Sequence, residues 1–389
     1  MKLGSVKLFL ITTLLLMMAP AIFAQDFSKL IDTLYEKGIL DAVESESLLQ
    51  EIQKPEGPAP LIFKGDFRLR FQSEKRGTTA ENRNRLRIRL RLGTDIALNE
   101  TLKLKFGVAS GAADPKSTNQ TLQDSFQHPD LRLDYAYLDY QASDQLRLVG
   151  GRFHNPLWTT DLLWDTDIMP DGFGFNYKSR LFGLDAFVNG GFFLIDEISG
   201  SALDPNMIVI QPGVKFAIDK GASARVAVTY TGTQYVTGKI LDNNAASNTG
   251  ATTGLANQYN NIGFTTELVL TDTKIVPQMS VIFDWTKNME VTTEGVGYML
   301  GVEFGDKKIA DLGNWQFKTS YRELSRNAWL DILPDADYYG GATFVKGMRY
   351  GLTYGLSSNT SAGASYFVMA NKDGSAEENL LQLDLNTKF

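Results

Sequence analysis

The chain has 389 residues, enough for one large barrel or for two to three soluble domains. The formal net charge of −7 argues against nucleic acid as a partner of the whole chain, and the absence of cysteine excludes thiol chemistry while being compatible with export. The mean hydropathy of −0.16 is typical of a soluble protein, but it does not exclude a membrane β-barrel, in which alternation hides the apolar band.

The first residues have the layout of a signal peptide. Lys2 and Lys7 give a positive start, and an apolar run follows from Leu8 to Met18. A small residue suited to cleavage then lies at Ala24. The run is too short for a helix that spans a membrane. We therefore expect residues 1–24 to be removed on export, with cleavage after Ala21 as a second option.

A short helical segment is predicted over residues 25–54. Phe27, Leu30 and Leu34 lie at helical spacing, and the sequence from Asp41 to Glu44 resembles a capping box that opens a second helix. This segment is either a helical hairpin near the periplasmic mouth of a barrel or a docking or oligomerisation module. Residues 55–60 contain three prolines, which predict a stiff linker.

The stretch 83–92 alternates arginine with aliphatic residues. Successive side chains of a strand point to opposite faces, so this segment as a strand has one cationic and one apolar face. As a helix it would scatter its arginines and form no apolar stripe. A membrane barrel gives the pattern a purpose, because one face meets lipid and the other a water-filled lumen. The cationic face consists of Arg83, Arg85, Arg87, Arg89 and Arg91.

The same period of two continues through residues 61–389. Short connections alternate with long ones near 112–130, 154–171, 195–206, 237–258 and 326–342, as in outer-membrane barrels. The sequence therefore predicts an all-β, transmembrane antiparallel β-barrel of about sixteen strands, with both termini in the periplasm. A soluble all-β repeat protein is the alternative. The candidate strands are 67–71, 83–92, 102–108, 131–137, 146–153, 172–179, 181–194, 207–218, 222–236, 259–270, 275–287, 295–305, 314–325, 343–356, 361–371 and 380–389.

Two local features are predicted within these strands. Gly150 and Gly151 suggest a β-bulge. Tyr135 and Tyr137 are expected on the outward parity with Leu133.

The final strand ends at Phe389, and a free aromatic C-terminus resembles the signal read by the barrel-assembly machinery of bacterial outer membranes. Thr387 departs from that pattern, in which an aromatic or aliphatic side chain is more usual at its position.

Two runs carry a resemblance to a known family. Residues 151–158 read G-R-F-H-N-P-L-W, and residues 160–167 read T-D-L-L-W-D-T-D. Together with the arginine-rich early strand and the helical segment after the signal, they resemble the putative bacterial porins. The resemblance implies a multi-stranded outer-membrane channel, outer-membrane lipid and lipopolysaccharide as surroundings, small hydrophilic solutes as cargo and a possible homotrimer. It implies no particular solute.

Basic side chains on the inward parity of the first three strands predict a cationic lumen wall. Arginine keeps its charge at physiological pH and binds carboxylate or phosphate in a fork. The predicted pore-lining basic residues are Arg68, Arg70, Arg83, Arg85, Arg87, Arg89, Arg91, Lys103 and Lys105.

The long connection 154–171 is acidic and contains no lysine or arginine. In many porins the third long connection folds into the barrel, and this segment takes that place here. We expect its acidic residues to face the arginines across an eyelet that selects solutes by size and charge. Alternatively, the arginines bind lipopolysaccharide or only solvate the lumen, and the aspartates form an outward calcium loop. The predicted constriction residues are Asp161, Asp165, Asp167 and Asp171.

The sequence gives little indication of an enzyme. The only histidines, His128 and His154, are not spaced as a metal pair, and no glycine-rich phosphate loop opens a helix. We expect no cofactor, no metal and no catalysis. The sequence favours a passive diffusion channel. An anion-selective channel for phosphate or organic acids and a structural or adhesive barrel with a plugged lumen remain as alternatives.

Overall fold

The computed structural model describes residues 31, 33–37, 41, 43–46, 61–77 and 81–389. The chain divides into two compact units, one of residues 63–95 and 101–389 and one of residues 1–62 and 96–100. The predicted signal peptide and the proline-rich linker lie outside the described residues. Residues 33–36 and 43–46 are helical. Asp41 and Glu44 exchange the capping-box bonds, from Glu44 N to Asp41 Oδ1 at 2.8 Å and from Asp41 N to Glu44 Oε2 at 3.1 Å.

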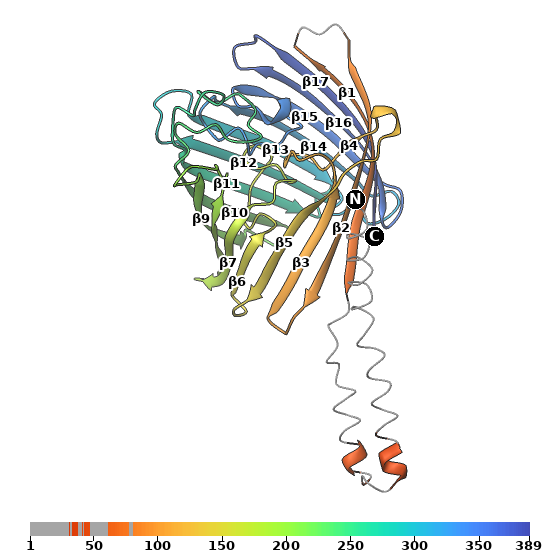
Figure 1. The fold of residues 1–389 in the computed structure, drawn as a ribbon. Coiled ribbons are helices and arrows are strands. Elements are labelled where there is room, and N and C mark those ends of the chain that lie inside the picture. The colour runs from red at the N-terminus through yellow and green to blue at the C-terminus, as the bar shows by residue number, and fades with distance from the viewer. Residues whose placement is uncertain (1–30, 32, 38–40, 42, 47–60, 78–80) are drawn as a thin grey trace. The chain divides into compact units, whose positions relative to one another are not determined.

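Sixteen long antiparallel strands form a closed barrel wall (Figure 1). Each pairs with its neighbours in chain order, and the last pairs with the first, so the prediction of about sixteen strands is confirmed. The wall strands are β1 (Ile62–Arg76), β2 (Arg83–Ala97), β3 (Leu102–Ser110), β5 (Leu131–Gln141), β6 (Leu146–Arg152), β7 (Asp171–Leu181), β8 (Leu184–Leu194), β9 (Asn206–Ala217), β10 (Ala222–Gln234), β11 (Asn260–Thr271), β12 (Gln278–Asn288), β13 (Val296–Gly305), β14 (Trp315–Leu324), β15 (Val345–Gly355), β16 (Thr360–Asn371) and β17 (Glu377–Lys388).

Three short elements lie in the loops. The two-residue strand β4 (Gln120–Thr121) adds to β2, where Arg87 pairs with Thr121. The 3-10 turns η1 (Asp124–Phe126) and η2 (Tyr339–Gly341) belong to the loops 111–130 and 325–344. β4 was not predicted, because two polar residues inside a loop carry no periodic signal.

The two ends of the barrel differ. One end, the turn end, carries mostly short connections such as 98–101, 142–145 and 218–221, and the other, the loop end, carries the long loops 111–130, 153–170, 235–259 and 325–344. The candidate strands 172–179 and 181–194 place a turn next to Arg180, but the turn between β7 and β8 lies at Phe182 and Gly183, both of which have positive φ. The five predicted long connections all lie at the loop end, but the turn-end connection 306–314 is longer than the loop-end connections 77–82, 289–295 and 372–376.

Side chains alternate along the wall strands as predicted. On β1, Phe67, Leu69 and Phe71 are exposed on the outside. On the same strand Arg70 and Gln72, which have the opposite parity, are each only 4% exposed and face the interior. The barrel therefore has an apolar outer surface and a polar, charged inner one.

A β-bulge in β5 reverses this parity locally. Gly107 of β3 pairs with Tyr135, whereas the next residue, Val108, pairs with Leu133, so Asp134 is extra. Leu133 faces outward, but Tyr135 and Tyr137 are 7% and 4% exposed and face inward. Their predicted outward orientation was wrong, because the sequence shows no break at the bulge.

The bulge predicted at Gly150 and Gly151 is absent. Both glycines pair in register with β5 and with β7. A Cβ on Gly151 would lie 2.5 Å from the carbonyl oxygen of Ala136. Glycine is therefore required at this position by close strand approach and by a φ of +125°, not by an inserted residue.

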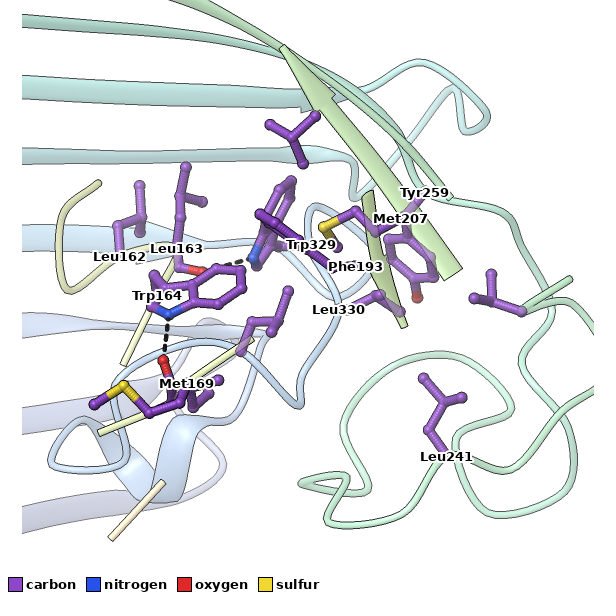
Figure 2. Packing of buried hydrophobic residues seen from close by; sticks show 14 of the residues in the cluster. Leu162, Leu163, Trp164, Met169, Phe193, Met207, Leu241, Tyr259, Trp329 and Leu330 are labelled. Atoms are coloured by element: carbon purple, nitrogen blue, oxygen red, sulfur yellow. Dashed lines mark hydrogen bonds between the residues drawn. The ribbon is translucent and has the colours of Figure 1, made fainter. Parts of the chain in front are cut away.

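The main hydrophobic core lies inside the barrel, where three long loops meet. Figure 2 shows aromatic and aliphatic side chains from these loops packed against one another and against residues from the wall. Trp164 lies edge-on to Phe193, with ring centroids 6.0 Å apart. The core includes Phe153, Leu162, Leu163 and Trp164 from loop 153–170, Leu241 and Leu255 from loop 235–259, and Trp329, Leu330 and Leu333 from loop 325–344.

Candidate constriction site

Loop 153–170 lies in the lumen and contacts strands around the wall. At its start, Gln211 of β9 donates to Trp158 O and accepts from Trp158 N, both at 2.8 Å. Thr160 donates to Asp284 of β12, which is 1% exposed. Near its end, Asp167 Oδ1 lies 3.3 Å from a guanidinium nitrogen of Arg91 on β2. This loop therefore narrows the interior.

Loop 325–344 joins loop 153–170 through backbone and side-chain hydrogen bonds. Asp165 N donates to Leu333 O at 2.7 Å, and Ala336 N donates to Asp165 Oδ2 at 2.8 Å. The indole N–H of Trp329 donates to Leu163 O at 2.8 Å (Figure 2). The two loops therefore form one partition inside the barrel. Sequence reasoning placed 325–344 among the outer loops and did not predict its place in the lumen.

Loop 235–259 supports that partition. Backbone N–H groups of Ser247 and Asn248 donate to Asp331 Oδ2 at 2.8 and 3.1 Å. The amide of Asn248 in turn donates to Trp329 O at 2.9 Å. Asp331 is 1% exposed, so its charge depends on these donors for compensation.

The arginine wall is held by carboxylates on neighbouring strands. Asp66 of β1 accepts from Arg89 at 2.6 Å and from Arg91 at 2.8 Å. Arg85 pairs with Glu74 at 2.6 Å. These bonds keep adjacent like charges in fixed positions, because each shared carboxylate offsets the repulsion between its arginines.

Three arginines of the wall, Arg68, Arg83 and Arg87, form no ion pair among the described residues. Arg68 donates to Asn119 Oδ1 at 2.5 Å, and Arg87 donates to Gln72 and, at 3.4 Å, to Ser117. Their partners are neutral, so their positive charge is not cancelled locally. All three line a polar cavity of about 280 Å³ between the wall and the partition.

The opposite side of this cavity is acidic. Asp165 and Asp167 of loop 153–170 line it together with Asp335 and Asp337 of loop 325–344. Asp337 lies 3.7 Å from Arg70 and accepts from Gln382 at 2.7 Å. Four carboxylates therefore face the arginines across one opening, which we call the eyelet.

The eyelet carboxylates differ in proton affinity. Burial raises the pKa of Asp165 to about 8, and repulsion from Asp167 acts in the same direction. Burial, with repulsion from Asp161 and Asp337, also raises the pKa of Asp335 well above its usual value. Burial opposes ionisation of Asp337 too, but the positive charge of Arg70 outweighs it and lowers the pKa of that carboxyl.

The other predicted residues lie around the eyelet rather than in it. Asp161 pairs with Arg349 of β15 at 2.7 Å, and Asp171, the first residue of β7, pairs with Arg152 at 2.7 Å. Neither aspartate lines the cavity with the arginine wall. Lys105 pairs with Asp139 at 2.8 Å. The predicted basic residues that line the eyelet are Arg68, Arg83, Arg85, Arg87 and Arg89, whereas Arg70 and Arg91 bind its carboxylates and Lys103 and Lys105 line no part of it.

The sequence did not predict Asp335, Asp337 and Asn119 at the eyelet, nor its other charged lining residues Glu74, Arg76, Asp114, Lys116 and Glu378. Loop 325–344 contains Asp331, Asp335 and Asp337 among apolar residues, a pattern similar to that of loop 153–170. That similarity was the available signal for a second inward loop. Asn119 carries no comparable signal.

No cluster suited to a metal ion and no helix able to cross a membrane occurs among the described residues. His154 packs against Tyr135, with ring centroids 4.5 Å apart, and burial lowers its pKa. His154 therefore packs against an aromatic ring at the start of loop 153–170.

The fold is therefore a closed antiparallel β-barrel with a charged cavity in its lumen. A family model described as "putative porin" matches residues 72–278 and 253–389, and the chain belongs to this family. A search of curated sequences finds no match.

Solved structures of the porin of Rhodopseudomonas blastica are similar to this chain. A tryptophan mutant of that porin has 10% identity and a TM-score of 0.48, and a triple mutant has 11% identity and a TM-score of 0.48. A lysine mutant has 11% identity and a TM-score of 0.49. Each comparison covers 85% of this chain and 100% of the other.

Proposed function

We propose that this protein is an outer-membrane porin of a Gram-negative bacterium, exported through a signal peptide and folded with its barrel in the membrane. Small hydrophilic solutes and ions diffuse passively through its lumen. The apolar outer surface supports the membrane setting, because exposed apolar surface of this extent needs a nonaqueous neighbour.

The observation that carries the proposal is the eyelet itself. Arg68 and Arg87 lie on one side and Asp167 and Asp337 on the other, around a cavity of about 280 Å³. Opposed charges on low-dielectric walls produce a transverse field, which favours polar solutes whose dipoles align with it. The eyelet therefore selects by size and polarity.

A second candidate function is an anion-selective channel. It is favoured by Arg68 and Arg87, whose neutral partners leave two positive charges available to a passing carboxylate or phosphate. A structural barrel with a closed lumen is the third possibility, and it predicts no conductance.

Planar-bilayer recordings test all three functions. The porin proposal expects stable conductance, and reversal potentials in a potassium chloride gradient report its selectivity. Replacing Arg87 by glutamine should shift selectivity towards cations, because the eyelet loses an uncompensated positive charge. Lys318→Gln is the matched control, since it removes one lysine charge on β14, outside the eyelet. Unchanged selectivity in Arg87→Gln would contradict the eyelet, and an absence of conductance in the unmodified protein would contradict the channel.

A further inference from the structure

A second charged region lies at the turn end of the lumen, below the start of loop 153–170. Two adjoining cavities of about 540 and 650 Å³ share Lys178, Asn189 and Arg225 as lining residues. Both are separate from the eyelet, which shares none of these residues. We call the two cavities together the vestibule.

Arg225 of β10 is the central cation of the vestibule. Its guanidinium lies 4.0 Å from the ring centroid of Trp158 and 4.7 Å from that of Phe187. Stacking on aromatic rings fixes the plane of a guanidinium while leaving its edge free to donate. No ion pair or side-chain hydrogen bond engages Arg225 among the described residues. Its fork of donors is therefore oriented but unoccupied.

The position of Trp158 is set independently of any ligand. Gln211, which is 1% exposed, holds both backbone polar groups of Trp158 and also donates to Thr229 at 3.0 Å. This clamp fixes the backbone of Trp158, and the indole already lies under Arg225 without a ligand, so the platform is formed before a solute arrives. A preformed site loses less conformational entropy on binding.

The charge around Arg225 is positive. Lys178, Arg180 and Lys215 line the same cavities, and none of them forms an ion pair among the residues that the structure describes. Three carboxylates, Asp144, Asp185 and Glu267, line the vestibule, and Glu267 of β11 lies directly across from Arg225 in the β10–β11 pair.

The vestibule also offers apolar surface. Phe187 and Val269 line the smaller cavity, and Leu157 and Trp158 line the larger one. The combination of a free guanidinium, flanking lysines and aromatic faces suits a ligand that has one anionic group on a compact apolar body.

We propose that the vestibule is a binding site for small organic acids, separate from the eyelet. Arg225 holds the carboxylate with help from Lys178, and Phe187 packs against the apolar part of the ligand. Binding at this site does not require conduction, so it can be tested apart from the proposed channel function.

Calorimetric titration of the full-length protein in detergent micelles with benzoate tests the proposal. Benzyl alcohol is the matched uncharged ligand and acetate the ligand without an apolar body. We expect benzoate to bind more tightly than either, and Arg225→Gln to weaken benzoate binding about tenfold or more, because a charge-assisted fork is lost. Lys318→Gln should bind benzoate as the unmodified protein does.

Tryptophan fluorescence provides a second readout. Benzoate should change the emission of the unmodified protein, and most of that change should disappear in Trp158→Phe. Arg225→Lys, which keeps the charge and loses the fork, should bind with intermediate affinity and serves if Arg225→Gln does not fold. Equal benzoate affinity in the Arg225 variant and the unmodified protein, or equal affinity for benzyl alcohol and benzoate, would overturn the proposal. Benzoate binding by a protein that does not conduct would leave the vestibule standing and reject only the channel.

Discussion

The carboxylate of Asp165 accepts a hydrogen bond from the backbone N–H of Ala336, which lies 171 positions later in the chain. The backbone N–H of Asp165 donates to Leu333 in the same loop. One aspartate therefore joins the two loops that form the acidic side of the eyelet. Its ionisation affects both the charge of the opening and the contact between the loops.

The ion selectivity of the channel should depend on pH through Asp165. Its pKa is raised from the usual 3.8 to about 8 by burial, so the carboxyl is protonated below that pH and ionised above it. As the pH rises from 7 to 9, the eyelet gains negative charge and reversal potentials should move towards cation selectivity. In Asp165→Asn this movement should be smaller, with the remainder due to Asp335, whose pKa is also raised. Asp373→Asn, in the exposed loop 372–376, is the control, and a full pH response in Asp165→Asn would contradict the assignment.

The same raised pKa has a consequence for stability. The folded protein binds a proton at Asp165 more tightly than the unfolded chain does, so this stabilisation is present at low pH. It should be lost progressively as the pH rises from about 4 to about 8. Thermal unfolding followed by circular dichroism should therefore show a smaller decrease of Tm over this range in Asp165→Asn than in the unmodified protein.

Replacing Gln211 by leucine should loosen loop 153–170. The amide is 1% exposed and satisfies both backbone polar groups of Trp158. Each group left unpaired costs about 1–3 kcal/mol. We expect a lower Tm and noisier open-channel currents. Gln211→Glu, which keeps the acceptor for Trp158 N, should be less affected. A quiet current in Gln211→Leu would show that the clamp does not hold the loop.

Replacing Gly107 by alanine should destabilise the barrel. A Cβ at Gly107 would lie 2.4 Å from the ring of Tyr135, which the bulge in β5 directs inward. Overpacking of this kind costs roughly 1–3 kcal/mol. Gly363→Ala is the control, because its nearest neighbour would be 3.7 Å away. Denaturant unfolding should separate the two variants, and Tyr135→Leu should partly restore Gly107→Ala. Equal stability of the two alanine variants would argue against the packing of Tyr135.

Phe389 should be required for efficient assembly. Its backbone exchanges hydrogen bonds with Gly65 at 2.8 and 3.1 Å, and a Cβ on Gly65 would lie 2.8 Å from its ring. The ring is 59% exposed on the outer surface, where another protein can reach it. Phe389→Ser should reduce the heat-modifiable folded form in outer-membrane fractions, and Thr387→Tyr should not. Normal amounts of the folded Phe389→Ser protein would contradict a role of Phe389 in assembly.

The wall was predictable because period-two alternation is local. The inward arginines of 83–92 follow directly from the sequence, and the structure places Arg85, Arg87 and Arg89 at the eyelet. The acidity of loop 153–170 was also visible, and Asp165 and Asp167 lie opposite those arginines. Local patterns therefore revealed both sides of the opening in part.

The remainder depended on contacts between distant segments. Asp335 and Asp337 reach the eyelet only because loop 325–344 pairs with Asp165, and no local pattern specifies that pairing. Asp161 is an aspartate of the same loop as Asp165, yet it forms an ion pair with Arg349 of β15 and does not line the eyelet. The bulge at Asp134 was hidden because an extra residue does not interrupt the run of apolar side chains.

Arg70 and Asp384 join the first and last strands of the wall, with two hydrogen bonds of 2.7 Å across the seam. Arg70 also attracts Asp337 of the eyelet. The Asp337 side of the opening is therefore tied to a contact between residues 314 positions apart in the chain. A barrel with this seam open would lack the Arg70–Asp384 bonds, so closure of the wall and the position of one charge at the opening depend on the same side chain.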